Sequence, residues 1–201
     1  MIAKGSLPWI LIPVIVALIS VFLSFLVITL IFLLITISFL IFFRDPERSV
    51  GFGIVAPADG KITDIDCKSN FFVVSILMAL HNVHVNRAPL AGKVINIKHF
   101  SGKHVPAFDK NSEFNERVEI TLITRIGKVK VVQIAGAFAR RIQSYVRKGN
   151  TISKGQRIGI IRFGSRVDLY LPKNKTKVLA RIGVKVKAGE SCLAVEAQDE
   201  N

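Results

Sequence analysis

The sequence predicts a mainly β protein, a β sandwich or barrel-like domain with an N-terminal transmembrane helical segment. Two observations carry this prediction. After Phe43 the chain is a series of short β-type runs separated by glycine-containing turns, and before Phe43 it is almost uniformly apolar. Short strands at regular spacing are typical of sandwiches and barrels. We therefore expect a membrane anchor over residues 1–43 and a single folded domain over 44–201.

The apolar run from Leu7 to Phe43 contains no charged residue. One membrane-spanning helix needs about 20 residues, so this run is long enough for two. We favour a tight helical hairpin, and one long tilted helix stays open. A hairpin puts the flanking basic residues Lys4 and Arg44 on the same side, which the positive-inside rule makes cytoplasmic, and a single helix would also have its basic flank on that side. Either arrangement puts the following domain on the cytoplasmic face of the cell membrane.

The domain after residue 43 is expected to contain at least five strands, namely Phe71–Leu77, Gly92–Ile97, Val118–Ile123, Val129–Ile134 and Ile158–Phe163. Ala135–Val146 is the one stretch that favours a helix. The polar stretch His99–Asn115 is interpreted as a surface loop that can act as a lid. A basic residue followed by a glycine turn recurs near Gly149, Gly155 and Gly189, which resembles the hairpins of lipoyl-type β sandwiches.

The charge of the chain indicates an anionic partner. It has 28 Lys and Arg residues against 14 Asp and Glu, a net charge of +14, and only Lys4 lies before Phe43. Nucleic acid and a membrane surface both fit such a charge. The apolar run, and the lack of aromatic residues interleaved with the basic ones, favour lipid over nucleic acid. The two cysteines, Cys67 and Cys192, form neither a zinc motif nor a disulfide framework.

The pair Gly164–Ser165 is the strongest functional signal. A serine that follows glycine can attack its own peptide bond, because glycine lets the turn adopt a strained conformation. Attack turns the Gly164 amide into an ester, and β-elimination followed by hydrolysis leaves a pyruvoyl group at residue 165. The chain is then divided into pieces 1–164 and 165–201. The serine needs a base, and a histidine oriented by a carboxylate is the usual solution.

Three residues can supply that base and carboxylate: His81, His84 and Asp59. Each also has a plain structural interpretation. Asp59–Gly60 is a common hairpin turn, and either histidine can be a structural residue at the end of an apolar run. Taken singly none is decisive, but together with Ser165 they fit one chemistry.

These motifs carry a family resemblance. Pro57-Ala58-Asp59-Gly60, His81-Asn82-Val83-His84, Asn115-Glu116-Arg117 and Arg162-Phe163-Gly164-Ser165-Arg166-Val167-Asp168 resemble the short, membrane-bound phosphatidylserine decarboxylase proenzymes, including the archaetidylserine decarboxylases of archaea. Arg166 stands where long-form relatives have threonine, so no role of that threonine is carried over.

The resemblance implies that Asp59, His84 and Ser165 perform the self-cleavage, and that His81 serves decarboxylation and substrate binding. The division of labour between the two histidines stays open. It also implies a covalent pyruvoyl cofactor that forms a Schiff base with a serine phospholipid and releases carbon dioxide and the ethanolamine lipid. No metal is expected. The two cleaved pieces are expected to stay associated, and a homodimer is compatible with the family.

The phosphodiester of such a substrate needs cations, and Arg87 and Arg166 are the candidates. Their alternative is to face solvent or anionic lipid. Two other functions are alternatives: a metal-dependent hydrolase using His81 and His84 with His99 or His104, and a non-enzymatic membrane adaptor. The first lacks a known ligand spacing, and the second gives no reason for the histidine pair.

Overall fold

The structure is a computed structural model that describes residues 1–103, 105–107, 109, 112, 114–137, 142–162 and 164–197. The chain divides into two compact units, Met1–Glu47 and Arg48–Asn201. Each unit is described by itself.

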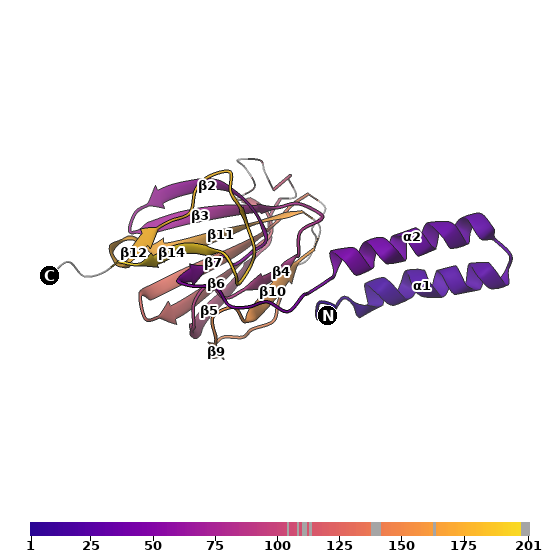
Figure 1. The fold of residues 1–201 in the computed structure, drawn as a ribbon, viewed down its shortest axis with the longest axis horizontal. Coiled ribbons are helices and arrows are strands. Elements are labelled where there is room, and N and C mark those ends of the chain that lie inside the picture. Colours follow the sequence, from indigo (N-terminus) through magenta and orange to yellow (C-terminus); the bar gives the residue numbers. More distant parts are fainter. Residues whose placement is uncertain are drawn as a thin grey trace. The chain divides into compact units, whose positions relative to one another are not determined.

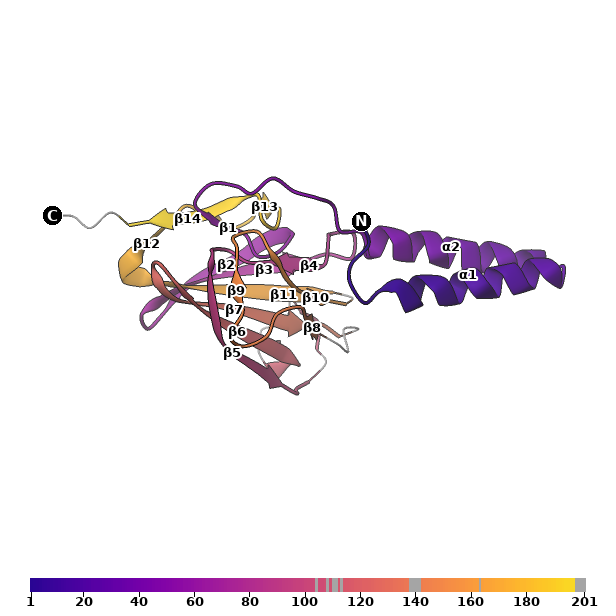
Figure 2. The same cartoon turned by 90° about the horizontal axis from the view of Figure 1, so that it is seen from below.

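The first unit is a helical hairpin of α1 (Leu7–Phe22) and α2 (Leu26–Phe42). The two helices lie side by side and run in opposite directions (Figures 1 and 2). The chain reverses at Ser24, which has a positive φ of 60°. A hydrogen bond of 2.8 Å between the hydroxyls of Ser20 and Thr29 joins the helices beside this turn. Of the two arrangements left open by the sequence, the structure therefore has the hairpin.

The transmembrane assignment made from the sequence is not supported. Within the described residues, no helix combines the length and apolar character needed to cross a membrane. The physical reason is the turn at residues 23–25, which divides the apolar run into helices of 16 and 17 residues.

The second unit is built from antiparallel strands in three sheets. The large sheet has eight strands in the order β13-β2-β3-β11-β7-β6-β5-β9, and the two small sheets have the orders β1-β14-β12 and β4-β10-β8. Figure 1 shows the central strands of the large sheet side by side. The strands are β1 (Ile54–Val55), β2 (Gly60–Lys68), β3 (Phe71–Met78), β4 (Val85–Arg87), β5 (Gly92–Phe100), β6 (Arg117–Thr124), β7 (Gly127–Ala135), β8 (Ile142–Ser144), β9 (Thr151–Ile152), β10 (Arg157–Ile161), β11 (Ser165–Pro172), β12 (Thr176–Val178), β13 (Lys185–Val186) and β14 (Cys192–Glu196), with a short 3-10 helix at Lys173–Lys175.

The mainly β prediction is confirmed, and each of the five expected strands overlaps an observed one: β3, β5, β6, β7 and β10. The helix expected over Ala135–Val146 is wrong in the described part of that stretch. Ala135 ends β7, and Ile142–Ser144 is the strand β8, which pairs with β10. Residues 138–141 lie outside the described residues, as do five positions of the expected loop at 99–115.

The core lies on one face of the large sheet and is made of β-branched and leucine side chains. Ile76, Val131 and Leu169 belong to it, from the neighbouring strands β3, β7 and β11. Strand β11 is hydrogen-bonded to β3 on one side and to β7 on the other. The residue at the start of β11 is therefore held between two strand ends, and that residue is Ser165.

Candidate active site

Ser165 is fully buried at the first position of β11. Its Cα partners across the sheet are Met78 on β3 and Ala135 on β7. The hydroxyl donates to the Met78 sulfur at 3.2 Å. Gly164, just before it, has a φ of +66°, and a Cβ built there would meet nothing within 4 Å. Glycine is thus required at 164 by the left-handed backbone and not by lack of space.

The end of β3 leads directly into the first histidine. Ala79 to Asn82 form a turn in which the Asn82 amide donates to the Ala79 carbonyl at 2.9 Å. The Asn82 side-chain oxygen accepts from the Ala79 amide at 2.8 Å and closes the turn from the other side. His81 lies exposed in this turn. His81 therefore lies in a turn that starts one residue after Met78, the residue that contacts Ser165.

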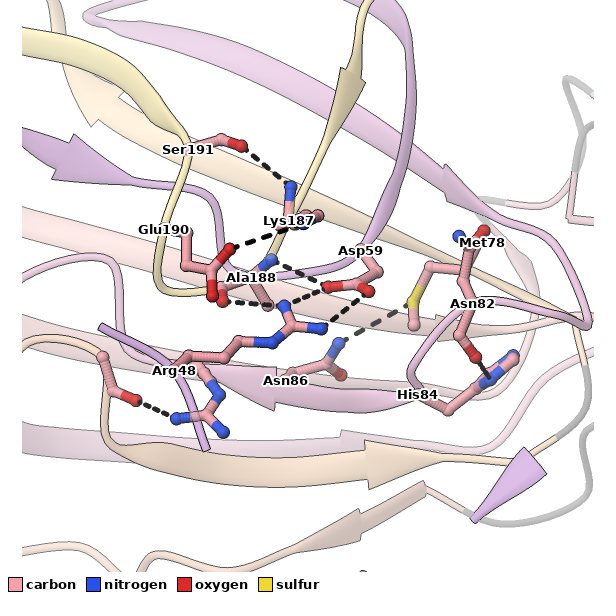
Figure 3. A network of polar contacts seen from close by, with 12 residues as sticks. Arg48, Asp59, Met78, Asn82, His84, Asn86, Lys187, Ala188, Glu190 and Ser191 are labelled. Carbon is pink, nitrogen blue, oxygen red and sulfur yellow. Dashed lines mark hydrogen bonds and ion pairs between the residues drawn. The ribbon is translucent and has the colours of Figure 1, made fainter. Parts of the chain in front are cut away.

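His84 is buried, and its orientation is fixed by a carbonyl. The ring Nδ1 lies 2.9 Å from the Asn82 carbonyl oxygen (Figure 3). A carbonyl oxygen only accepts, so Nδ1 carries the proton, and the neutral ring has its lone pair at Nε2. This is the tautomer that a general base needs. In this structure the Asn82 carbonyl does the orienting that the sequence interpretation assigned to a carboxylate.

Asp59 has other partners. Its Oδ1 and Oδ2 accept from the two terminal nitrogens of Arg48 at 2.5 and 2.9 Å, and Oδ1 also accepts from the Ala188 amide at 2.8 Å. Figure 3 shows Asp59 turned toward Arg48 and Ala188, and His84 toward Asn82. Asp59 thus pairs with Arg48 and Ala188, His84 with Asn82, and Ser165 with Met78.

A pocket of about 440 Å³ brings Asp59 and His81 to one wall. Its other polar lining is the Asn82 side chain and three lysines: Lys61, Lys185 and Lys187. The lysines are exposed, so the pocket is open, positively charged and adjacent to the turn that follows Met78. Such a pocket suits a small anionic group.

The two arginine candidates have structural partners. Arg166 follows Ser165 on β11, so its side chain points to the opposite face of the sheet. There it pairs with the Asp168 carboxylate at 2.9 Å and donates to the Ser112 hydroxyl at 3.1 Å. Arg87 is buried and donates to the Gly155 carbonyl at 3.1 Å. Neither arginine is among the residues that line the pocket beside His81.

Two buried amides near Ser165 were missed by the sequence interpretation. Asn86 approaches the Met78 sulfur with its Nδ2 at 3.7 Å, and its Oδ1 accepts from Gln133 Nε2 at 2.6 Å. The one available signal was Gln133 itself, because a glutamine inside the apolar run Val131–Ile134 is unusual for a buried strand. Gln133 is thus linked through Asn86 to Met78, the residue that contacts Ser165.

Among the described residues, no group of three His, Cys, Asp or Glu side chains could hold a metal ion. The structure therefore gives no support to the metal-dependent hydrolase. His99 lies 3.0 Å from the Glu116 carboxylate. His104, the other histidine of that hypothesis, lies outside the described residues.

A buried serine after a left-handed glycine, and two histidines after the end of the neighbouring strand, are residue types that enzymes use for nucleophilic chemistry. The comparisons with known proteins narrow this class. The family model for phosphatidylserine decarboxylase matches residues 35–194. The chain belongs to the phosphatidylserine decarboxylase family.

Individual relatives can be aligned with most or all of the chain. A phosphatidylserine decarboxylase proenzyme of Streptomyces coelicolor is 44% identical over 195 residues, covering 94% of this chain and 89% of that protein. A Methanosarcina mazei protein that bears the name archaetidylserine decarboxylase proenzyme is 42% identical over 212 residues and covers 100% of both. One from Archaeoglobus fulgidus with the same name is 45% identical over 160 residues, covering 80% of this chain and 77% of that protein.

Proposed function

We propose that this decarboxylase cleaves itself between Gly164 and Ser165, converts Ser165 into a pyruvoyl group, and then turns a serine phospholipid into the ethanolamine phospholipid and carbon dioxide. The substrate is phosphatidylserine or archaetidylserine, since relatives with either name are similar to this chain. Their shared description as proenzymes supports processing.

The observation that carries the proposal is the Gly164–Ser165 junction. Gly164, which has a left-handed φ, directly precedes Ser165. The Ser165 hydroxyl is buried and donates a hydrogen bond to the Met78 sulfur. A glycine at this position leaves no side chain on the residue whose carbonyl the hydroxyl would attack.

In the cleavage, Ser165 Oγ attacks the Gly164 carbonyl carbon and gives its proton to a base. His84 is that base, since its Nε2 holds the lone pair. The C–N bond breaks, the nitrogen takes up a proton and an ester remains. A base then removes the Ser165 α-proton, the Cβ–Oγ bond breaks and the Gly164 carboxylate leaves. Hydrolysis of the resulting dehydroalanine releases ammonia and leaves the pyruvoyl group.

The pyruvoyl carbonyl supplies an electron sink for the bond to the departing carboxylate, the part that pyridoxal phosphate plays elsewhere. His81 donates a proton to the substrate α-carbon from the pocket wall. Lys61, Lys185 and Lys187 attract the phosphodiester. We assign this role to the lysines in preference to Arg166, because the Arg166 guanidinium is paired with Asp168.

The two pieces stay together after cleavage. The C-terminal piece begins with β11, which lies between β3 and β7 in the middle of the large sheet. Its leucines and valine, Val167, Leu169 and Leu171, are fully buried. Removal of the piece would open the core, so the burial of these side chains holds it in place.

The protein acts at the cell membrane, with the catalytic domain on the cytoplasmic face. The tip of the helical hairpin supports this location, because Phe22, Leu23 and Phe25 are exposed there, Phe22 at 88%. Lys4 and Arg44 lie at the other end of the hairpin sequence, where an apolar hairpin that dips into one leaflet meets the headgroups.

The test is a pair of proteins, wild type and Ser165→Ala, purified in detergent and supplied with vesicles of phosphatidylserine. The wild type is expected to run as two fragments on a denaturing gel and to release carbon dioxide. Ser165→Ala is expected to stay as one chain and to be inactive. A Ser165→Ala protein that is still cut, or that still releases carbon dioxide, contradicts the proposal.

A further inference from the structure

The carbonyl that Ser165 would attack already accepts a hydrogen bond. The amide of Gly136, the residue after β7, donates to the Gly164 carbonyl oxygen at 2.9 Å. A donor at this oxygen draws charge from the carbonyl carbon and stabilises the oxyanion that forms when a nucleophile adds to it.

The same peptide group is held from its other side. The carbonyl of the Ala135–Gly136 peptide accepts from Asn115 Nδ2 at 2.8 Å. A hydrogen bond to the carbonyl of a peptide polarises that peptide and strengthens its N–H as a donor. Asn115 therefore acts on Gly164 through one intervening peptide group.

Asn115 is itself rigidly placed. It is fully buried, its Oδ1 accepts from the Val105 amide at 3.0 Å, and its Nδ2 donates to the Val105 carbonyl at 2.7 Å. The neighbouring Ala135 amide donates to the Glu116 carbonyl at 2.9 Å. These bonds leave the Ala135–Gly136 peptide little freedom to rotate away from Gly164.

Position 136 requires glycine for lack of space, whereas position 164 requires it for its left-handed φ. A Cβ built on Gly136 would lie 2.4 Å from the Gly164 carbonyl oxygen. Real Cβ atoms do not approach backbone so closely, so only glycine lets the donor come within hydrogen-bonding distance.

We propose that the Gly136 amide is the oxyanion donor of the self-cleavage and that Asn115 is the positioning residue that aims it. The inference rests on the proposed function, because it concerns the same scissile bond. When Ser165 Oγ adds to the carbonyl, the electron pair of the C=O bond moves to the Gly164 oxygen, where Gly136 N–H stabilises it. The pair returns as the C–N bond breaks, the amine takes the proton and the ester remains.

The same bond also continues the ladder between β7 and β11, which pairs Ser165 with Ala135. A bond with that role alone would affect stability without a specific effect on the cleavage rate. The test therefore measures rate and stability together.

The first variant is Asn115→Ala, made as full-length precursor by cell-free synthesis into phosphatidylserine vesicles and followed over time on denaturing gels. Parallel samples receive neutral hydroxylamine, which cuts any ester that has formed. Leu122→Ala is the control, because Leu122 is fully buried on β6 and does not contact Gly164 or Ser165.

Asn115→Ala is expected to be cut at least about 10-fold more slowly than wild type. Hydroxylamine should not restore the rate, because the slow step is formation of the ester. Leu122→Ala should lose thermal stability and still be cut at close to the wild-type rate. Equal rates for Asn115→Ala and wild type, or slowing of the two variants in proportion to their loss of stability, would overturn the inference.

A second change removes only the donor. Replacement of Gly136 by glycolic acid turns its amide into an ester linkage and deletes the N–H without adding a side chain. Loss of one oxyanion donor slows such reactions by about 100- to 1,000-fold, and we expect a decrease in that range here. Cleavage at the wild-type rate would refute the role of Gly136. A wild-type chain that is never cut would instead refute the proposed function itself.

Discussion

The first prediction concerns Asp59 and distinguishes a structural role of this residue from a direct role in self-cleavage. The family resemblance assigns Asp59 to self-cleavage, whereas the structure pairs it with Arg48 and Ala188. The Arg48 and Asp59 side chains are only 6% and 10% exposed. Asp59→Ala would leave the Arg48 guanidinium in the protein interior without the carboxylate that offsets its charge. Removal of one partner of a buried ion pair costs about 3–5 kcal/mol.

For a domain of this size, such a loss lowers Tm by roughly 10 °C. The measurement is thermal unfolding followed by circular dichroism, with Asp59→Ala added to a Ser165→Ala chain so that every molecule is uncut. Asp64→Asn, a change to an exposed carboxylate on β2, the strand that follows Asp59, is the matched control and should shift the free energy of unfolding by no more than about 0.5 kcal/mol.

The second measurement is the rate of self-cleavage of the Asp59 and Arg48 variants. In the Ser165 background, Asp59→Ala should be cut slowly, and Arg48→Ala should show a similar defect, because both changes disturb the pocket wall that carries Asp59. If Asp59→Ala abolished cutting while Tm stayed unchanged, and Arg48→Ala were cut normally, the structural interpretation of the ion pair would be refuted. Asp59 would then act directly on the reaction.

Three further predictions concern the base, the turn and the pocket. His84→Gln should leave most of the chain uncut on a gel, because glutamine offers no basic nitrogen at the Nε2 position. If this variant were cut at the wild-type rate, another residue would have to be the base. Gly164→Ala should fold, since a Cβ there meets nothing, but its positive φ should lower the free energy of unfolding by about 1–2 kcal/mol in urea titrations, and an unchanged midpoint would contradict the left-handed turn. Lys185→Glu with Lys187→Glu should leave cutting intact and raise KM for phosphatidylserine vesicles about 10-fold or more, whereas an unchanged KM would remove the lysines from substrate binding.

Local patterns in the sequence were sufficient for several elements. The β-branched runs of β3, β6 and β7 identify strands because their composition fits a buried pleated surface. The Gly164–Ser165 pair was visible in the sequence, and Gly164 has the left-handed φ of +66° that glycine tolerates. The turn glycines Gly149, Gly155 and Gly189 have positive φ values of 94°, 77° and 78°, in agreement with the glycine turns expected there.

Other features depend on contacts between distant segments. The helix expected after Ala135 reflects local propensity, which the pairing of β8 with β10 overrides. The hairpin was expected from the sequence, but the count of apolar residues did not show that the turn at Ser24 leaves helices of only 16 and 17 residues.

The contacts within the site also join segments that are distant in the sequence. Asp59 meets Ala188, 129 positions away in the chain. Asn115 reaches Gly164 only through the peptide after β7. The motif containing Asn115 was visible in the sequence, but its role depends on three segments that the sheet brings together.

The central claim is that Ser165 is converted, and the intact mass of the purified wild-type protein tests it most directly. We expect two species, one ending at Gly164 and one spanning residues 165–201 whose mass is lower by one ammonia than that of the same peptide with an N-terminal serine. A single mass for the uncut chain in a preparation that decarboxylates phosphatidylserine, or a second fragment that retains its serine amine, would contradict the account.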